Sequence, residues 1–145
     1  MSSYAHLGLL VLLVIIPAST GYGGGAPNDA CVDMSPHHGT VERTSPSKFS
    51  LYLTEETTQG GDILKVCVKG GTFEGILLQM RVVGDTVPVG TFNGTRGTIA
   101  NDTKTMNCTA DNDTVTHSKP TIKKDPTCFY WKAPNNKIPQ NVHFV

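Results

Sequence analysis

The sequence predicts an all-β fold, an immunoglobulin-like antiparallel β-sandwich with two disulfides. After position 21, about seven short segments of strand type are separated by turn residues every 8 to 12 positions or so. The same region shows no convincing helical period. It also holds all four cysteines, and an even number of cysteines in a small domain is typical of a disulfide framework.

Residues 71–83, with the sequence GTFEGILLQMRVV, are expected to form the central strand. A largely apolar run leads into Arg81, whereas a strand with one face in water would alternate. We therefore expect this strand to be buried on both faces, with the other strands packed around it.

Residues 63–69 are expected to form a strand whose two faces can be assigned, because alternate side chains point in opposite directions. Leu64, Val66 and Val68 share the core face, so Lys65, Cys67 and Lys69 share the outer one. In residues 127–132, Phe129 and Trp131 lie opposite Cys128 and Tyr130. The other expected strands cover residues 48–54, 87–92 (an edge strand, because it contains Pro88), 103–109, 114–117 and 141–145.

Residues 22–47 are rich in Gly, Pro, Ser and Asp, and we expect an irregular segment that lies over the sandwich and is fastened by Cys31. Cys67 and Cys128 both belong to outward faces of strands that we expect to be neighbours, so a bridge between them is geometrically reasonable. Cys31 then pairs with Cys108 by elimination. A zinc site is the alternative, but no CxxC or HxxxH spacing is present.

Residues 1–21 are expected to be a secretory signal peptide. Their apolar run, residues 7–16, is shorter than the roughly 20 residues that a membrane span needs, and Pro17 and small residues follow it. Cleavage after Gly21 places Ser19 at the third position before the cut. The n-region lacks Lys and Arg, and the alternative is a short buried helix of the mature fold.

Removing 21 residues from 145 leaves 124, which suffices for one domain, residues 22–145. The removed part carries no Asp, Glu, Lys or Arg, so 12 basic and 12 acidic residues still balance. A neutral chain gives no electrostatic argument for nucleic acid or anionic lipid unless its charges are segregated on the surface. No second apolar run of spanning length occurs, so we expect no membrane span and a secreted monomer.

Six motifs occur in an order that resembles the reeler domain, the N-terminal module of reelin. This module is also found in F-spondin and in ferric-chelate-reductase-like membrane proteins, and it stands alone in small secreted defense proteins of invertebrates. The resemblance covers nearly all of the mature chain. The motifs are GAPNDACVDMSPHHG at 25–39, TSPSKFSL at 44–51, GTFEGILLQMR at 71–81, VPVGTF at 87–92, VTHS at 115–118 and FYWKAP at 129–134.

The resemblance implies an immunoglobulin-like sandwich whose usual disulfide matches Cys31 with Cys108, with Cys67 and Cys128 as an additional pair. Two departures stand out. The family continues past the position of Phe144 to finish its last strand, so this chain looks shortened. Nothing in it resembles the electron-transfer domains of the reductase-type relatives, which argues against that activity.

Four glycosylation sequons lie within about twenty residues, which suggests that sugars coat one flank of the domain. At least two should be occupied, Asn93 and Asn101 first, although a composition rich in Asn and Thr also generates unused sites. Asn107 is doubtful because the next residue, Cys108, should be bridged. The four are Asn93, Asn101, Asn107 and Asn112.

No other residues indicate a catalytic or metal site. His37 and His38 are adjacent, their side chains diverge, and a turn pair explains them better than a metal site does. His117 lies in the VTHS motif and is expected to be packed or hydrogen-bonded. No Ser or Cys occurs in a recognisable nucleophile setting. Residues 118–126 contain three lysines, Lys119, Lys123 and Lys124, together with Asp125. They could form an anion-binding patch, but an ordinary solvated loop is favoured.

We therefore expect a secreted, non-enzymatic protein without cofactor. The resemblance implies a role in innate defense, with antimicrobial activity or binding to a microbial surface. The alternatives are an extracellular matrix or adhesion module, whose exposed loops would form the contact surface, and a truncated ectodomain of a reductase-like membrane protein. The extracellular ligand stays unidentified at this point.

Overall fold

The structure is a computed structural model, and it describes residues 21–39, 45–58, 61–92 and 100–145. These ranges contain eight strands, one helical turn and one 3₁₀ turn. In chain order they are α1 (Ala30–Asp33), β1 (Ser50–Thr58), β2 (Gly61–Lys69), β3 (Leu77–Val82), β4 (Thr91–Phe92), β5 (Thr103–Met106), β6 (Thr114–His117), β7 (Thr127–Lys132), η2 (Pro134–Asn136) and β8 (Val142–Phe144).

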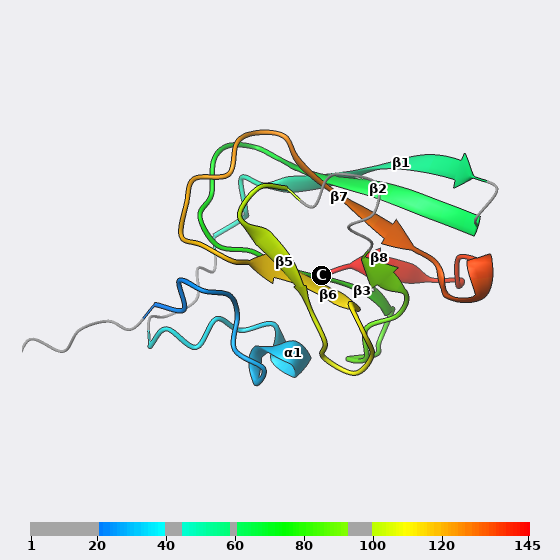
Figure 1. The fold of residues 1–145 in the computed structure, drawn as a ribbon, viewed down its shortest axis with the longest axis horizontal. Coiled ribbons are helices and arrows are strands. Elements are labelled where there is room, and N and C mark those ends of the chain that lie inside the picture. Colours follow the sequence, from blue (N-terminus) through cyan, green and yellow to red (C-terminus); the bar gives the residue numbers. More distant parts are fainter. Residues whose placement is uncertain (1–20, 40–44, 59–60, 93–99) are drawn as a thin grey trace, which may run out of the picture.

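The strands form two antiparallel four-stranded sheets packed face to face (Figure 1). The first sheet has the order β1-β2-β7-β4 and the second has the order β5-β6-β3-β8. The predicted all-β sandwich is confirmed. β2 and β7 are direct neighbours in the first sheet, as expected from the sequence. β4 is an edge strand, but it covers only Thr91–Phe92 of the expected residues 87–92, and Pro88 lies before it in an isolated bridge with Arg81.

The core lies between the inner faces of the two sheets, and Trp131 and Phe129 of β7 are its largest fully buried side chains. The Trp131 ring meets Phe144 of β8 edge to face at 6.3 Å, and its Nε1 donates a hydrogen bond to the Val89 carbonyl at 2.8 Å. Gly90 has a φ of +72° and lies so close to the indole that a Cβ atom would come within 2.4 Å of it. The close approach of this backbone to Trp131 therefore requires glycine.

β3 is the central strand of the second sheet, pairing with β6 on one side and β8 on the other. It begins at Leu77, later than predicted, because residues 71–76 make only an isolated bridge between Phe73 and Lys123. Both faces of β3 are buried, as predicted. Leu78 and Met80 belong to the core, but Gln79 and Arg81 point outward and are covered by another part of the chain.

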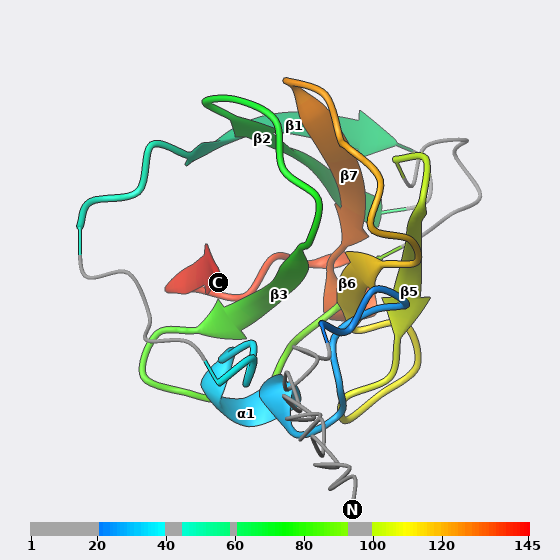
Figure 2. The same cartoon turned by 90° about the vertical axis from the view of Figure 1, so that its left-hand side faces the viewer.

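The N-terminal segment, residues 21–39, covers the outer face of the second sheet (Figure 2). Arg81 donates hydrogen bonds to the carbonyls of Cys31 at 2.7 Å and Val32 at 3.0 Å, and Gln79 Nε2 donates to Cys31 O at 3.2 Å. Further along, Ala26 N donates to Thr116 Oγ1 at 2.8 Å. The expected irregular cover is thus present, although it contains the single helical turn α1, which is too short to leave a periodic pattern.

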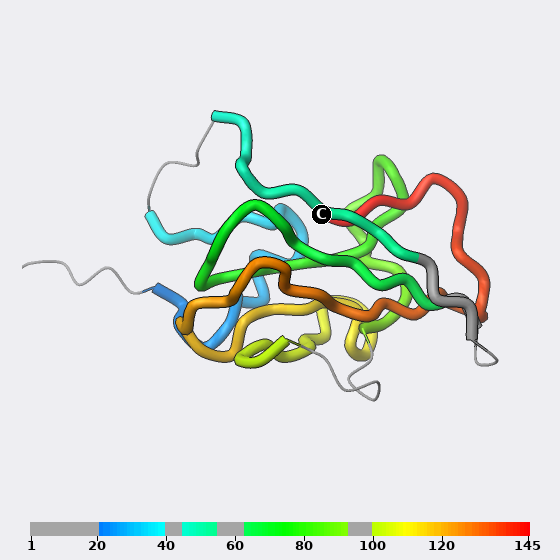
Figure 3. The backbone as a smooth tube through the Cα atoms, turned by 90° about the horizontal axis from the view of Figure 1, so that it is seen from above, coloured from blue at the N-terminus to red at the C-terminus, as the bar shows by residue number. Residues whose placement is uncertain are grey.

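Two disulfides close the fold, Cys31–Cys108 and Cys67–Cys128. The first attaches the N-terminal cover to the end of β5, and Figure 3 shows that cover (blue) running beside the segment that contains β5 and β6 (yellow to orange). The second joins residues that lie directly opposite each other on β2 and β7. These are the two pairs expected from the sequence.

Candidate functional site

The outer face of the first sheet carries a group of lysines, which we call the lysine face. β2 contributes Lys65 and Lys69, and β7 contributes Lys132, which has the same orientation as Tyr130. Lys65 is paired with Tyr130 in the ladder, and its ammonium lies 5.8 Å from the centre of the tyrosine ring. The side chains lie together because alternate positions of two paired strands share one face.

The Cys67–Cys128 disulfide lies in the middle of the lysine face. Its Cα atoms are 4.0 Å apart, and Cys67 is only 1% exposed although it points outward. Tyr52 of β1 is level with Cys67 and is 40% exposed. The disulfide therefore lies between the flanking lysines and tyrosines and links the two strands that carry most of them.

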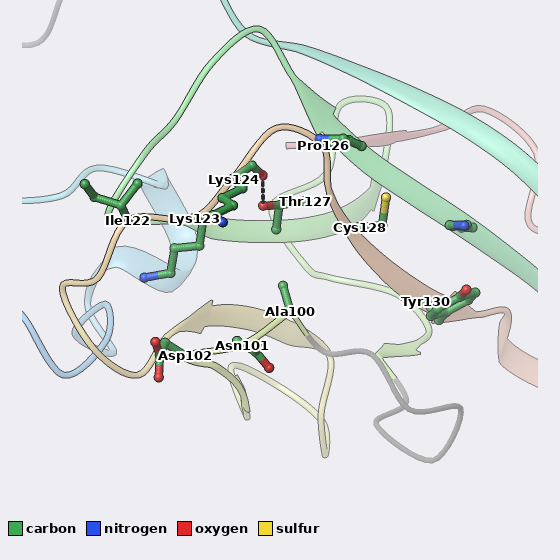
Figure 4. Close-up of a pocket in the computed structure, with 11 residues that line it drawn as sticks. Ala100, Asn101, Asp102, Ile122, Lys123, Lys124, Pro126, Thr127, Cys128 and Tyr130 are labelled. Atoms are coloured by element: carbon green, nitrogen blue, oxygen red, sulfur yellow. Dashed lines mark hydrogen bonds between the residues drawn. The ribbon is translucent and has the colours of Figure 1, made fainter.

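A hollow of about 670 Å³ opens at one end of the lysine face (Figure 4). Lys65, Cys128 and Tyr130 form the wall from the sheet, and Ala100, Asn101 and Asp102 approach from the loop before β5. The remaining lining residues come from the segment that leads into β7: Ile122, Lys123, Lys124, Pro126 and Thr127.

A second, smaller hollow of about 480 Å³ shares Pro126 with the first and is otherwise lined by Ser50, Tyr52, Lys69 and Asp125. Asp125 Oδ2 accepts hydrogen bonds from the backbone N–H groups of Gly70 and Gly71, both at 3.1 Å. This carboxylate closes the turn after β2. It is the acidic group on this part of the face among the side chains that the structure describes.

Lys123 does not belong to a solvated loop, and the interpretation of residues 118–126 as an ordinary basic loop is wrong at this position. The side chain is 4% exposed, and its ammonium donates to three backbone carbonyls, those of Glu74 at 2.5 Å, Lys119 at 2.7 Å and Thr121 at 2.9 Å. Burial lowers the pKa of Lys123 below its usual value. Lys123 organises the loop and is not free to bind an anion.

The other two lysines of the loop are exposed and differ in their partners. Lys119 forms an ion pair of 3.5 Å with Asp102, whose pKa is lowered, first by the hydrogen bond from Thr121 and then by the Lys119 charge. Lys124 lines the larger hollow, as Lys65 does. The lysine face thus comprises Lys65, Lys69, Lys124 and Lys132.

His117 is hydrogen-bonded on both ring nitrogens, as predicted. Nε2 lies 2.7 Å from the Tyr22 carbonyl, and Nδ1 lies 3.3 Å from both the N and the O of Ile76. The ring forms part of a mainly apolar hollow of about 330 Å³ under the N-terminal cover. It holds the cover in place.

His37 and His38 face different partners. His37 Nε2 lies 3.1 Å from Asp33 Oδ2, and His38 stacks at 5.9 Å on Tyr22. His37 has a φ of +49°, as in a turn. Within the described ranges, no three His, Cys, Asp or Glu side chains come together as a metal site would require.

Three of the four sequon asparagines are described and exposed, Asn101, Asn107 and Asn112, whereas Asn93 lies outside the described residues. Asn107 uses both ends of its amide, donating to Asp111 at 2.9 Å and accepting from Asn112 N at 2.8 Å. Asn101 lines the larger hollow. Occupancy of these sites stays a prediction.

The lysine face is a surface that sequence reasoning assembled only in part. The alternation of residues 63–69 placed Lys65 and Lys69 outward, and the same argument applied to residues 127–132 would have added Lys132. No local sequence pattern predicts the position of Lys124, which lies near this face only because of the conformation of the loop before β7. Chemically, the arrangement offers several cations and two aromatic rings on a rigid support, which suits contact with an anionic surface.

These features define a small β-sandwich with two disulfides. The profile of the Reeler domain matches residues 29–145, so the chain belongs to the reeler domain family. The family and the fold expected from the sequence motifs are confirmed.

The similar proteins fall into two groups. "Putative defense protein 3" of Antheraea mylitta is 28% identical over 142 residues, which cover 94% of this chain and 82% of that protein. "Putative defense protein Hdd11" of Hyphantria cunea is 29% identical over 136 residues, covering 88% of this chain and 78% of that protein. Human "Ferric-chelate reductase 1" is 26% identical over 141 residues, which make up 96% of this chain but only 23% of the reductase.

Among solved structures, the crystal structure of the human F-spondin reeler domain is similar, with a TM-score of 0.48 and 20% identity. The alignment covers 68% of this chain and 76% of that one.

In the part of this chain that the structure describes, no helix combines the length and the apolar character that crossing a membrane requires.

Proposed function

We propose that this chain is a secreted, non-enzymatic defense protein that binds anionic microbial surfaces through the lysine face. In this proposal residues 1–21 are removed on export and residues 22–145 form the acting domain. The defense role is supported by the names of the relatives whose length this chain covers for the most part. The match to the reductase covers too little of that protein to support its activity here.

The observation that carries the proposal is the segregation of charge. The chain is neutral as a whole, with 12 basic and 12 acidic residues. Four lysines nevertheless lie on or beside one sheet face around one disulfide, and the two described carboxylates nearby are already engaged, Asp125 by backbone amides and Asp102 by Lys119 and Thr121. Each lysine close to a strongly anionic surface contributes about 1 kcal/mol, so four together give useful binding that salt weakens.

Glycosylation is part of the proposal. Asn101 and Asn112 are exposed on the side of the molecule that contains β5, and we propose that they and Asn93 carry the sugars. Asn107 is excluded because its amide is hydrogen-bonded on both ends and Cys108 follows it in a disulfide. Mass spectrometry of peptides from protein exported by eukaryotic cells tests this assignment, and the same sample gives the new N-terminus, expected at Tyr22.

The binding test compares variants of equal charge. Purified protein is mixed with washed bacterial cells at low salt, and the bound fraction is measured after sedimentation. Lys69→Glu and Lys124→Glu should each reduce the affinity about tenfold, because each replaces an attractive charge on the face with a repulsive one. Lys104→Glu changes the net charge equally on β5, in the other sheet, and should leave the affinity within about twofold.

Equal losses for all three variants would contradict the lysine face as the binding surface. Failure of the wild-type protein to bind any of a panel of bacteria would contradict the microbial target. If the same protein were instead retained on acidic extracellular matrix in a manner sensitive to Lys69→Glu, the adhesion-module alternative would replace the defense role.

A further inference from the structure

β1 is an edge strand whose outer side has no partner among the described residues. It pairs with β2 along nine residues, from Ser50 opposite Lys69 to Thr58 opposite Gly61, and it stands first in the order β1-β2-β7-β4. Natural sheets protect such edges with proline, lysine or a bulge. Residues 50–54, SLYLT, contain no proline and no charge, and their pairing with β2 is continuous.

The backbone groups that face outward on this edge can be identified. The Cα atoms of the opposed residues Cys67 and Cys128 are 4.0 Å apart, the short spacing of a pair without mutual hydrogen bonds. The N–H and C=O of Cys67 therefore point toward β1 and bond Tyr52. Because these groups alternate along a strand, those of Leu51 and Leu53 point to the open side.

The hydrogen bond of Phe92 N to Asn112 O supports the same alternation on the opposite edge of the sheet. Continuing from Cys128, Lys132 of β7 directs its backbone groups to Thr91 of β4, so the N–H of Phe92 must point away from β7. It does, because it donates to Asn112 O at 2.7 Å.

The side chains of Leu51 and Leu53 are exposed to water, although they lie on the face of the sheet that elsewhere packs on the core. They are paired with Val68 and Val66, so all four side chains share the inner face of the sheet. Val66 and Val68 are 0% and 7% exposed, but Leu51 is 42% and Leu53 is 52% exposed. The second sheet does not reach under β1.

We propose that a second copy of this chain pairs with β1 in antiparallel fashion, with the two-fold axis at Tyr52. In this register Leu51 of each copy lies opposite Leu53 of the other, and both have backbone groups directed at the partner. The two pairs complete the open edge and bury the exposed leucines against each other. A continuous eight-stranded sheet results, in place of the monomer expected from the sequence.

The leucines select this register over its neighbours. With the axis at Tyr52, both exposed leucines of each copy lie opposite a leucine of the other copy. Shifting the axis to Leu51 keeps the hydrogen-bonding parity but sets Leu53 opposite Phe49, which already packs against the core, and shifting it to Leu53 sets Leu51 opposite position 55, outside the uncharged residues 50–54. The axis at Tyr52 is therefore favoured.

Sedimentation equilibrium over a range of protein concentrations, from micromolar to millimolar, tests the proposal with two matched double variants. Leu51→Lys with Leu53→Lys sets like charges opposite each other and should lower the dimerisation constant more than tenfold. Leu51→Lys with Leu53→Glu is equally polar, but it sets each lysine opposite a glutamate of the other copy and should keep the dimer. Val83→Lys with Ile122→Lys is the control, because these residues are 64% and 66% exposed outside β1.

Monomeric wild-type protein at every concentration would overturn the inference. Equal dimer loss in both β1 variants would overturn the register, and an intact dimer in the Lys/Lys variant would show that another surface associates. Circular dichroism of each variant checks that the fold persists. The result does not depend on bacterial binding, so the proposed function and this inference stand or fall separately.

Discussion

The outer faces of the two sheets differ in what covers them. On the second sheet, the buried polar side chains Gln79 and Arg81 hold the N-terminal segment, and the Cys31–Cys108 bridge fastens it. On the first sheet the Cys67–Cys128 bridge lies within the face itself, among lysines of which Lys69 and Lys124 are exposed and Lys65 and Lys132 are half-buried. One sandwich thus has a disulfide that attaches a covering segment on one side and a disulfide that joins two neighbouring strands on the other, where the sheet face is not covered by that segment.

Removing each disulfide in turn should have the largest effect and should separate these two roles. Replacing either cysteine pair by alanine should cost about 4 kcal/mol in the chain-entropy model, because the bridged residues are 77 and 61 positions apart. Loss of Cys31–Cys108 should also speed amide hydrogen exchange in the N-terminal cover, for example at Ala26. Loss of Cys67–Cys128 should lower the stability of the whole domain, but it should not make amide exchange in the cover faster than this global loss of stability explains.

Arg81→Met tests whether the cover depends on buried polar contacts. Arg81 is 5% exposed and bonds Gln79, Val32 and Cys31, so the variant leaves carbonyls unpaired and should lose about 2 to 3 kcal/mol in urea unfolding. Lys65→Met makes a similar change on the lysine face. Equal losses in the two variants would contradict the distinction between a covered and a free face.

Asp113 should make the loop next to the Cys31–Cys108 bridge sensitive to acid. Burial alone would raise its pKa, but N–H groups of Cys108, Ala110 and Thr109 outweigh burial, and the pKa of Asp113 is lowered. Because the folded pKa lies below the unfolded value, the stabilisation is complete above about pH 4 and is lost as the pH falls through the folded pKa.

The Asp113→Asn variant should therefore be less stable than wild type by about 1 to 2 kcal/mol at pH 7. The difference should shrink as the pH falls below about 4. Thermal unfolding from pH 2 to pH 7 measures it. A constant difference across this range would show that the Asp113 charge has no role, and exposed Asp29→Asn serves as the control.

Lys69→Gln should have the smallest effect on stability, within about 0.5 kcal/mol, because the side chain is exposed. The same variant should elute earlier than wild type from a cation exchanger at low salt, since one charge of the lysine face is lost. Lys104→Gln, with its charge on β5, should elute closer to wild type. Identical elution of the two variants would indicate that the charges are not segregated.

Much of the sandwich could be predicted because strand alternation is a local property. Residues 127–132 have the predicted bounds and faces, and β2 exposes Lys65 and Lys69 as expected. Residues 71–76 could not be predicted as irregular, because their apolar character is explained by packing of Phe73 and Ile76 against the core and not by a ladder. The burial of Gln79 and Arg81 depends on a segment nearly fifty positions away.

The candidate site was harder to predict than the fold because it combines segments that are distant in sequence. Lys124 joins Lys65 only through the loop before β7, and Lys123 is withdrawn from the surface by three carbonyls that no motif marks. A charged residue in a polar loop is normally solvated, so sequence alone favoured the wrong environment for Lys123.

The open edge of β1 also bears on valency. Two copies joined along this strand would present two lysine faces on the same side of one sheet, at a fixed separation. A second weak contact then forms within the bound complex, at an effective concentration that can be millimolar, and the avidity can exceed that of one face by 10² or more. A repetitive, densely anionic layer would therefore retain the dimer, whereas isolated acidic molecules would not.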